Sequence, residues 1–233
     1  MSHSITAIIP ALNEEKNLEG AVNIFKKAAL DNSMEYEIII FNDASSDKTG
    51  EIANQLASSD KNIYVIHNEK RMGLGYNYFK GLELAKKEYV IMVPGDNEIE
   101  EDSIREIVFS AGKSDIIIPY TENMEIRPLP RRLTSRLFTA LINLLFGLKI
   151  KYFNGPVLHK TELVKKVRIS EMSFAYQAEI LVKMIKSNRS YLEVPMRIKP
   201  REYGKSNAIS LGNFIAVGKT ILNLFRSVYF NKD

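Results

Sequence analysis

Five short apolar runs alternate with segments of helical periodicity in the first half of the chain, and this alternation is the strongest constraint on the fold. The runs cover residues 5–9, 37–41, 62–66, 89–93 and 115–120. Runs of this length, bounded by turn residues, are typical of strands that are buried on both faces. Strands that alternate with helices form parallel sheets with right-handed crossovers. The sequence therefore predicts an α/β fold with a Rossmann-like, mostly parallel sheet flanked by helices.

Acidic residues directly follow two of these runs. Asp43 and Asp47 come after the second run, and Asp96 and Glu98 come after the fourth. In open parallel sheets, ligands bind beyond the carboxyl ends of the strands. Carboxylates gathered there raise one another's pKa unless a cation or a hydrogen-bond donor neutralises them. A divalent metal ion that carries a phosphate ester meets this requirement.

The net charge of +4 conceals two halves of opposite sign. Residues 1–126 hold 12 Lys and Arg against 22 Asp and Glu, whereas residues 127–233 hold 20 against 6. The first half suits a metal ion or a neutral base, and the second half suits an anion, such as a phosphate or an anionic membrane surface. The alternative is that solvated lysines and arginines only keep the protein soluble. With 233 residues, of which 45% are apolar, the chain can bury one full core.

Several common motifs are missing from the sequence. The GLG at residues 73–75 does not follow the first run, and Tyr78 stands where a dinucleotide-binding loop has its third glycine. No P-loop occurs, and the three histidines lack the spacing of a zinc site. The chain has no cysteine, which excludes disulfides and thiolate chemistry. The first residues do not resemble a signal peptide, so we expect a cytoplasmic location.

Two segments of the second half are predicted to be helices that are apolar on most sides. They cover residues 132–148 and 211–230. The first is too short to cross a bilayer, and the second is interrupted by Lys219, Asn223 and Arg226. A position in a membrane interface fits both segments. Core packing or a dimer interface fits them as well.

Six segments, in this order, resemble the family 2 glycosyltransferases of the GT-A fold, and most of all their dolichol-phosphate mannose synthase branch. The segments are IIPALNEEKNL, NDASSDKT, RMGLGYNYFKGLELAKKEYVIMVPGDNE, RRLTSR, YQAEIL and VPMRIKPREYGKSN. The resemblance covers residues 5–207, nearly the whole chain. It implies a GT-A domain over residues 1–210, in which residues 1–120 bind the nucleotide and residues 121–210 the acceptor. An amphipathic helix at 211–233 would follow.

The resemblance implies a pocket for a UDP-sugar or a GDP-sugar. Four residues would line the pocket: Pro10, Asn13, Glu14 and Gly75. Asp43 would read the base edge, because a carboxylate that accepts from a ring N–H suits uracil or guanine. Asn13 and Asp47 also have a simpler interpretation, since Asn and Asp are common helix caps.

The resemblance also implies a divalent cation, Mg²⁺ or Mn²⁺, held by Asp96 and Glu98. In an extended chain both side chains would point toward one cation. The cation would bridge the two phosphates of the donor and neutralise the leaving nucleoside diphosphate. The sequence departs from the family here, because Pro94 stands where the first acid of the Asp-x-Asp motif is expected. A relative that binds nucleotide sugars without turnover is therefore an alternative.

The basic half would hold the acceptor. RRLTSR resembles the Arg-Lys-x-x-Ser-Arg run of the mannose synthases, which implies that Arg131, Ser135 and Arg136 bind a phosphate. PREYGKS resembles the family's Arg-x-x-Gly-x-Ser loop, in which Arg201 and Lys205 close over the phosphates. The acid of the Asp-x-Thr-x-Gly motif is missing, since the chain reads KYFNG at this place. The acceptor can therefore differ from a plain polyprenyl phosphate.

The need for a general base depends on the acceptor. A phosphate monoester is largely ionised at pH 7 and needs none, so catalysis would rest on positioning and charge stabilisation. A sugar hydroxyl would need a carboxylate base, and Glu179 is the best candidate. The alternative for Glu179 is an ion pair with Arg201 or another cation. The predicted catalytic residues are Asp96, Glu179 and Arg201.

The sequence thus predicts an inverting, metal-dependent glycosyltransferase with a lipid-linked acceptor, bound peripherally at the cytoplasmic face of a membrane. The expected partners are the donor, the acceptor and the membrane surface, with a homo-oligomer or a membrane protein as further candidates. Three rivals remain: transfer to a soluble or glycan hydroxyl, a binding-only relative, and a protein that binds RNA or anionic membranes without nucleotide. Nucleic acid is not an expected partner. Binding of RNA or anionic membranes without nucleotide would instead show steep salt dependence.

Overall fold

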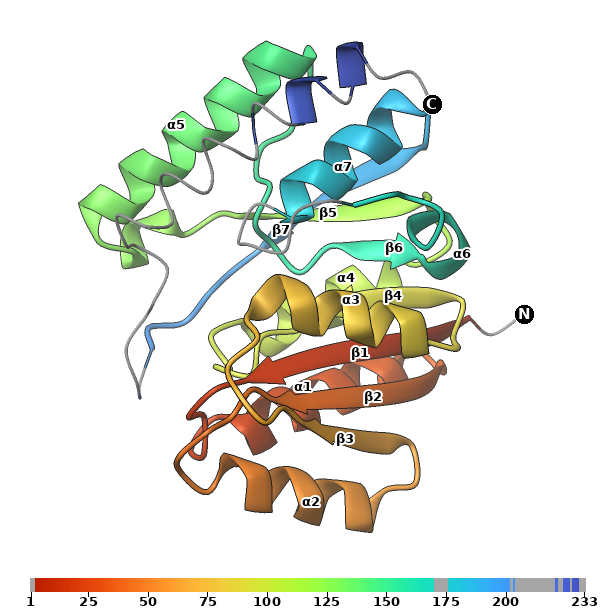
Figure 1. Cartoon of the computed structure of the whole chain (residues 1–233), viewed down its shortest axis with the longest axis vertical. Coiled ribbons are helices and arrows are strands. Elements are labelled where there is room, and N and C mark those ends of the chain that lie inside the picture. The colour runs from red at the N-terminus through yellow and green to blue at the C-terminus, as the bar shows by residue number, and fades with distance from the viewer. Residues whose placement is uncertain are drawn as a thin grey trace.

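A computed structural model describes residues 3–169, 176–201, 203, 221, 224–226 and 228–230. Its centre is one seven-stranded sheet with helices on both faces (Figure 1). The strands are β1 (Ser4–Ala11), β2 (Glu35–Asn42), β3 (Ile63–His67), β4 (Tyr89–Met92), β5 (Ile116–Thr121), β6 (Leu158–Lys160) and β7 (Tyr191–Met196). The helices are α1 (Leu18–Asp31), α2 (Thr49–Ser59), α3 (Leu74–Leu84), α4 (Glu101–Phe109), η1 (Met124–Ile126), α5 (Leu129–Phe146), α6 (Thr161–Val164) and α7 (Tyr176–Lys186).

The strand order in the sheet is β3-β2-β1-β4-β6-β5-β7. The first four strands are parallel, and β7 is parallel to β5. β6 runs antiparallel to both of its neighbours, β4 and β5. The prediction of a mostly parallel sheet between helices is confirmed. It did not include β6 or β7, because three residues give no periodic signal and YLEVPM alternates only weakly.

Alternate side chains of β1 face two separate cores. Ile5, Ala7 and Ile9 pack in the core covered by α1, α2 and α4. Ile8 packs in the opposite core, with residues of α3, α5 and α7. Because successive side chains of a strand point to opposite faces, one continuous apolar run fills both cores. Figure 1 shows α1 and α3 on opposite faces of this strand.

The first strand is longer than the apolar run at residues 5–9 from which it is predicted. β1 continues to Ala11 and pairs with β2 along its full length, with Pro10 opposite Phe41. On the other side, the pairing of β1 with β4 stops at Ile8. The carbonyl of Pro10 faces that unpaired side, where it accepts a hydrogen bond from the Gly95 N–H. The missing N–H of proline therefore removes no ladder hydrogen bond.

The long apolar helix predicted at 132–148 is α5, which begins three residues earlier and ends at Gly147 in a left-handed conformation (φ 61°). Ile142 and Phe146 are buried. Five leucines of α5 are exposed: Leu129, Leu133, Leu137, Leu141 and Leu144. Among the described residues, no helix is long and apolar enough to cross a membrane.

Most of the predicted segment 211–230 lies outside the described residues. Of its described residues, Leu224 is buried, and the Tyr229 hydroxyl donates a hydrogen bond to the Leu145 carbonyl at 3.0 Å. The Phe225 ring packs near Phe146, with ring centroids 6.2 Å apart. The end of this segment therefore packs on the end of α5.

His159 on β6 predicts an acid sensitivity of the fold. It is fully buried, and burial lowers its pKa to about 3. A histidine in the unfolded chain binds a proton near pH 6.5, so the unfolded state takes up this proton first as pH falls. Stability is therefore lost between about pH 6.5 and 3, with a loss of about 2 kcal/mol already at pH 5.

Urea unfolding of the wild type and a His159→Gln variant at pH 7 and pH 5 tests this prediction. Glutamine keeps a partner for Gln177, which lies 3.0 Å from the His159 ring. We expect the free energy of unfolding of the wild type to fall by about 2 kcal/mol more than that of the variant. Equal losses would show that His159 titrates normally in the folded protein.

Candidate active site

The carboxyl ends of β1, β2 and β4 meet at one edge of the sheet, and the loop after β4 is held against β1 there. The N–H of Val93 donates to the Ile8 carbonyl at 3.0 Å, and the N–H of Gly95 donates to the Pro10 carbonyl at 3.2 Å. A Cβ at position 95 would lie 3.1 Å from the Pro10 carbonyl oxygen and from the Ala11 Cβ. Glycine thus permits the close approach that fixes the loop carrying Asp96 and Glu98.

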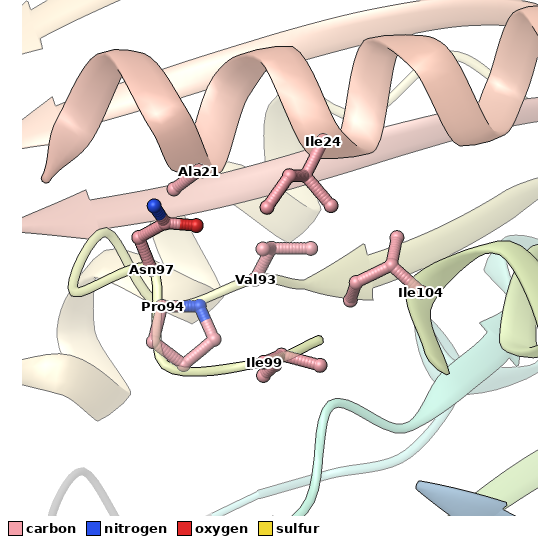
Figure 2. Close-up of a pocket in the computed structure, with 7 residues that line it drawn as sticks. All are labelled: Ala21, Ile24, Val93, Pro94, Asn97, Ile99 and Ile104. Carbon is pink, nitrogen blue, oxygen red and sulfur yellow. The ribbon is translucent and has the colours of Figure 1, made fainter. Parts of the chain in front are cut away.

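Pro94 lies in apolar surroundings. Figure 2 shows its ring on the loop after β4, beside a small hollow with Ala21 and Ile24 of α1 on the other side. Val93, Ile99 and Ile104 complete the apolar part of the lining, and Asn97 is its polar member. An ionised carboxylate in such surroundings would be costly. Proline at this position therefore fits its packing, and Asp96 and Glu98 are the acids left to bind a cation.

Asp96 and Glu98 converge on one cation, and in this structure that cation is the guanidinium of Arg201. The Arg201 Nη2 lies 2.7 Å from an Asp96 carboxylate oxygen, and its Nε lies 2.5 Å from a Glu98 oxygen. The same Nη2 lies 3.7 Å from a carboxylate oxygen of Glu14. Three of the predicted site residues are thus gathered around a fourth. Contrary to the expectation from the sequence, the chain between the two acids is not extended, because Asn97 has a positive φ of 53°.

Two further arginines extend this cluster. Arg127 contacts the second carboxylate oxygen of Glu98, and both side chains are largely buried. Burial, and after it the charge of Arg127, lower the pKa of Arg131, while the nearby Tyr152, Glu98 and Asp96 act in the opposite direction. Arg131, predicted as a phosphate ligand, is therefore close enough to Asp96 and Glu98 to interact with their charges. The sequence analysis missed Arg127, although it opens the basic run that continues to Arg136.

The segment after β7 is fastened to the loop after β4, which places Arg201. The Lys199 N–H donates to the Glu98 carbonyl at 2.8 Å, and the Glu100 N–H donates to the Arg197 carbonyl at 3.0 Å. The Asn123 side chain donates to the Ile198 carbonyl at 2.7 Å and accepts from its N–H at 3.0 Å. These bonds join residues far apart in the sequence.

The acids of the cluster differ in their pKa. Burial, and after it the charge of Glu98, raise the pKa of Asp96 despite the opposing effect of Arg201. Burial also raises the pKa of Glu14. For Glu98, burial works in the same direction, but hydrogen bonds from Arg127 and Arg201 outweigh it and lower the pKa. Glu98 is therefore the acid that holds its negative charge most firmly.

Asp43 fastens the loop between β3 and α3. One carboxylate oxygen accepts hydrogen bonds from the Met72 N–H and the Asn68 amide, both at 2.8 Å, and the other accepts from the Gly73 N–H at 2.9 Å. Burial tends to raise the pKa of Asp43, but these donors outweigh burial and lower it. Three donors leave little free acceptor capacity, so the predicted contact with a base stays a prediction.

Asn13 does not cap α1, because this helix begins at Leu18 after Asn17. It has a positive φ of 56°, and its side-chain oxygen accepts from the Ser46 N–H at 2.8 Å. Asp47 accepts from the N–H of Thr49, the first residue of α2, at 3.0 Å, and also from the Glu15 N–H at 3.2 Å. These bonds join the loops that follow β1 and β2.

The remaining predicted site residues that the structure describes lie on three helices and differ in how far they are buried. Gly75 is buried in the first turn of α3, Ser135 is half-buried on α5, and Arg136 is exposed on the same helix. Glu179 is buried on α7 and pairs with Lys183 of the same helix at 2.8 Å. Lys205 lies outside the described residues.

The acidic pair fits a metal ion that arrives with phosphate oxygens. Within the described ranges, no three Asp, Glu, His or Cys side chains form a set that would hold a metal alone. Mg²⁺ is usually bound by one or two carboxylates, with water and substrate phosphates as further ligands. Asp96 and Glu98 are two such carboxylates, and Arg201 contacts both of them in this structure.

Comparison with known proteins identifies the family. The family model "Glycosyl transferase family 2" matches residues 6–161. The chain belongs to this family. A dolichol-phosphate mannosyltransferase of Pyrococcus furiosus is 28% identical over 97% of this chain and 62% of its own length. A putative glycosyltransferase, EpsH of Bacillus subtilis, is 23% identical over 83% of this chain and 59% of its own. The chain thus spans about three fifths of the length of these two relatives.

Solved structures of other glycosyltransferases share the fold. The glucosyl-3-phosphoglycerate synthase of Mycobacterium tuberculosis in complex with UDP has a TM-score of 0.71 at 17% identity, over 99% of this chain and 82% of that one. The same enzyme with Mn²⁺ and UDP-glucose has a TM-score of 0.70 at 15% identity, over 99% of this chain and 80% of that one. The predicted GT-A fold is thereby confirmed.

Proposed function

We propose that the chain is an inverting, metal-dependent glycosyltransferase that moves a sugar from a UDP- or GDP-sugar to a lipid-linked phosphate. One observation carries the proposal: two acids suited to a metal and three arginines suited to phosphates gather at the carboxyl edge of the sheet. The pair Asp96 and Glu98 contacts Arg201, Glu98 also contacts Arg127, and Arg131 senses their charges. The family assignment supports the reaction class.

The two halves of the chain divide this work. Residues 1–120 bind the donor, with Pro10, Asn13, Glu14, Asp43 and Gly75 around the nucleotide. The complex of the mycobacterial synthase with Mn²⁺ and UDP-glucose supports a donor of this kind. Residues 121–210 bind the acceptor, with the phosphate held by the arginines of α5.

The chemistry is a displacement at the anomeric carbon. An oxygen of the ionised acceptor phosphate attacks the carbon from the side opposite to the diphosphate, and the bond from carbon to diphosphate breaks. Asp96 and Glu98 would hold the metal ion, which would supply positive charge for the leaving diphosphate. Arg201 and Arg131 hold the phosphate oxygens in place, because guanidinium groups match them with paired hydrogen bonds. A phosphate nucleophile carries its own charge, so no residue needs to remove a proton.

The exposed leucines of α5 support an acceptor that lies in a membrane. Leu137 and Leu144 are 70% and 81% exposed, and Arg136 lies among them on the helix surface. Apolar side chains beside basic ones suit the interface of an anionic membrane. The protein would then bind peripherally at the cytoplasmic face. The name of the Pyrococcus relative, a dolichol-phosphate mannosyltransferase, agrees with such an acceptor.

Transfer to a hydroxyl group is a second candidate. The mycobacterial synthase has been crystallised with Mn²⁺, UDP-glucose and phosphoglyceric acid, a small molecule that carries both a hydroxyl group and a phosphate. The arginines of this chain suit such a phosphate equally well. A hydroxyl nucleophile would need a base, and Glu179 is the candidate residue.

A thermal-shift panel of UDP, GDP, CDP and TDP, each with and without Mn²⁺, tests the proposed donor. A ligand at about a hundred times its dissociation constant stabilises a protein by about 2.7 kcal/mol. We expect UDP or GDP to raise the melting temperature, and Mn²⁺ to enlarge the effect. If no nucleotide raises it at saturating concentrations, the donor assignment is wrong.

A further inference from the structure

We propose that Arg201 is a built-in substitute for the metal ion. Its guanidinium occupies the carboxylates of Asp96 and Glu98 in the ligand-free protein, and a metal–diphosphate complex displaces it. The inference rests on the proposed function, because it concerns the same acidic pair. It adds an order of binding to the proposed function. Arg201 opposes the binding of a free metal ion, and a metal ion bound to a diphosphate displaces Arg201.

The geometry of the pair carries the first step. Arg201 uses separate nitrogens for the two acids, at 2.7 Å to Asp96 and 2.5 Å to Glu98, and Glu14 lies 3.7 Å away. The side chains of Arg201 and Asp96 are only 19% and 20% exposed, and that of Glu98 is 5% exposed. A metal ion needs the same carboxylate oxygens. The guanidinium and the metal therefore compete for one site.

The backbone around Arg201 allows the guanidinium to leave. The hydrogen bonds that hold this segment to residues 98–100 and to Asn123 fall on residues 197–199. Among the described residues, Arg201 itself is held through its side chain, by the acids. Its backbone can therefore stay in place while the side chain rotates.

The displaced guanidinium needs a new anion, because a partly buried charge without a partner is costly. A diphosphate bound at the same edge offers phosphate oxygens, which match a guanidinium in two parallel hydrogen bonds. Exchange of partners thus gives Arg201 two roles. It opposes binding of metal alone, and it favours binding of metal together with diphosphate.

Arg127 explains why the exchange need not disrupt the site. It contacts the other oxygen of Glu98, so Glu98 keeps one cationic partner when Arg201 leaves. The segment carrying Arg127 comes before α5 and is separate from the Arg201 segment. The acidic pair therefore stays partly neutralised throughout.

The test compares Mn²⁺ binding by the wild type and an Arg201→Gln variant, with and without UDP, by electron paramagnetic resonance of free Mn²⁺. For Mn²⁺ alone, we expect the variant to bind about tenfold more tightly, because its carboxylates have lost a charge-assisted partner. With UDP present, we expect the variant to bind about tenfold more weakly, because the diphosphate has lost the same partner. A purely structural role for Arg201 would weaken both, and that result would overturn the proposal.

Two further variants complete the design. Arg201→Lys keeps the charge but cannot bridge both acids, so its Mn²⁺ affinities should lie between those of the wild type and Arg201→Gln. If Arg201→Gln fails to fold, the same comparison is made with Arg201→Lys. Arg197→Gln is the matched control, because its exposed side chain lies 3.7 Å from Glu100 and away from the acidic pair. Its affinities should equal those of the wild type. The arm with Mn²⁺ alone needs no nucleotide, so failure of the exchange and failure of the donor assignment give different results.

Discussion

Asp96→Asn is expected to lower kcat/KM for sugar transfer by about 10²–10³-fold, comparable to the loss of one preorganised electrostatic contact at an active site. The substitution keeps the size of the side chain and removes the charge that a metal ion needs. It also removes an anionic partner of Arg201, whose Nη2 lies 2.7 Å from the Asp96 carboxylate. Two measurements test this prediction. One is the turnover rate with the donor that the thermal-shift panel selects, and the other is the increase in nucleotide affinity that Mn²⁺ causes.

The second acid should add to this effect. A double variant, Asp96→Asn with Glu98→Gln, is expected to lose the effect of Mn²⁺ on nucleotide affinity completely. Far-ultraviolet circular dichroism and urea unfolding check that it folds, because Glu98 also holds Arg127. Asp102→Asn is the matched control, since Asp102 is an exposed acid nearby on α4 that pairs with Arg105. Unchanged metal dependence in the double variant would disprove the metal site.

The fold of the first half was predictable because each strand there is a local signal. The runs at 37–41 and 89–93 are apolar at nearly every position, and their polar ends mark where the chain leaves the sheet. The same ends placed Asp43, Asp96 and Glu98 at one edge, since carboxyl ends of parallel strands meet there. β6 was not predictable in this way. It is short and antiparallel, and its place between β4 and β5 depends on pairing alone.

The partners of the site residues could not be predicted from the sequence. Arg201 was predicted to bind phosphates, yet 105 positions separate it from Asp96, and only the pairing of its segment with residues 98–100 brings the two together. Asp43 carries no sign in the sequence that it will fasten the loop of Met72 and Gly73. Long-range contacts of this kind depend on where loops lie in the folded chain. Residue types restrict the chemistry that a site can carry out, whereas the positions of the loops determine which side chains contact each other.

The acceptor decides which of two substitutions is the more harmful. With a polyprenyl phosphate acceptor, Arg131→Ala should lower kcat/KM by about 10–100-fold, the effect of losing a hydrogen bond to a charged group. Glu179→Gln should then change kcat/KM of the folded enzyme little, because an ionised phosphate needs no base. Loss of the ion pair with Lys183 should instead lower the stability of the variant. A hydroxyl acceptor reverses the order, since the amide cannot act as a base. Initial rates with polyprenyl phosphate in detergent, and with phosphoglyceric acid in buffer, measure both variants against both acceptors.

Arg189→Ala provides the control for loss of positive charge, because Arg189 is an exposed residue of the same basic half, in the turn between α7 and β7. It should leave both rates unchanged. If Arg131→Ala is as active as this control with polyprenyl phosphate, the basic end of α5 does not hold the acceptor. The exposed leucines of α5 would then no longer support a lipid-linked acceptor, because Arg131 is the residue of this helix that interacts with the charges of Asp96 and Glu98. The charge of Arg131 alone does not separate the two acceptors, because a guanidinium also suits the phosphate of phosphoglyceric acid. The exposed leucines of α5 are the feature that favours a lipid-linked acceptor, and they do so only if Arg131 on the same helix holds its phosphate.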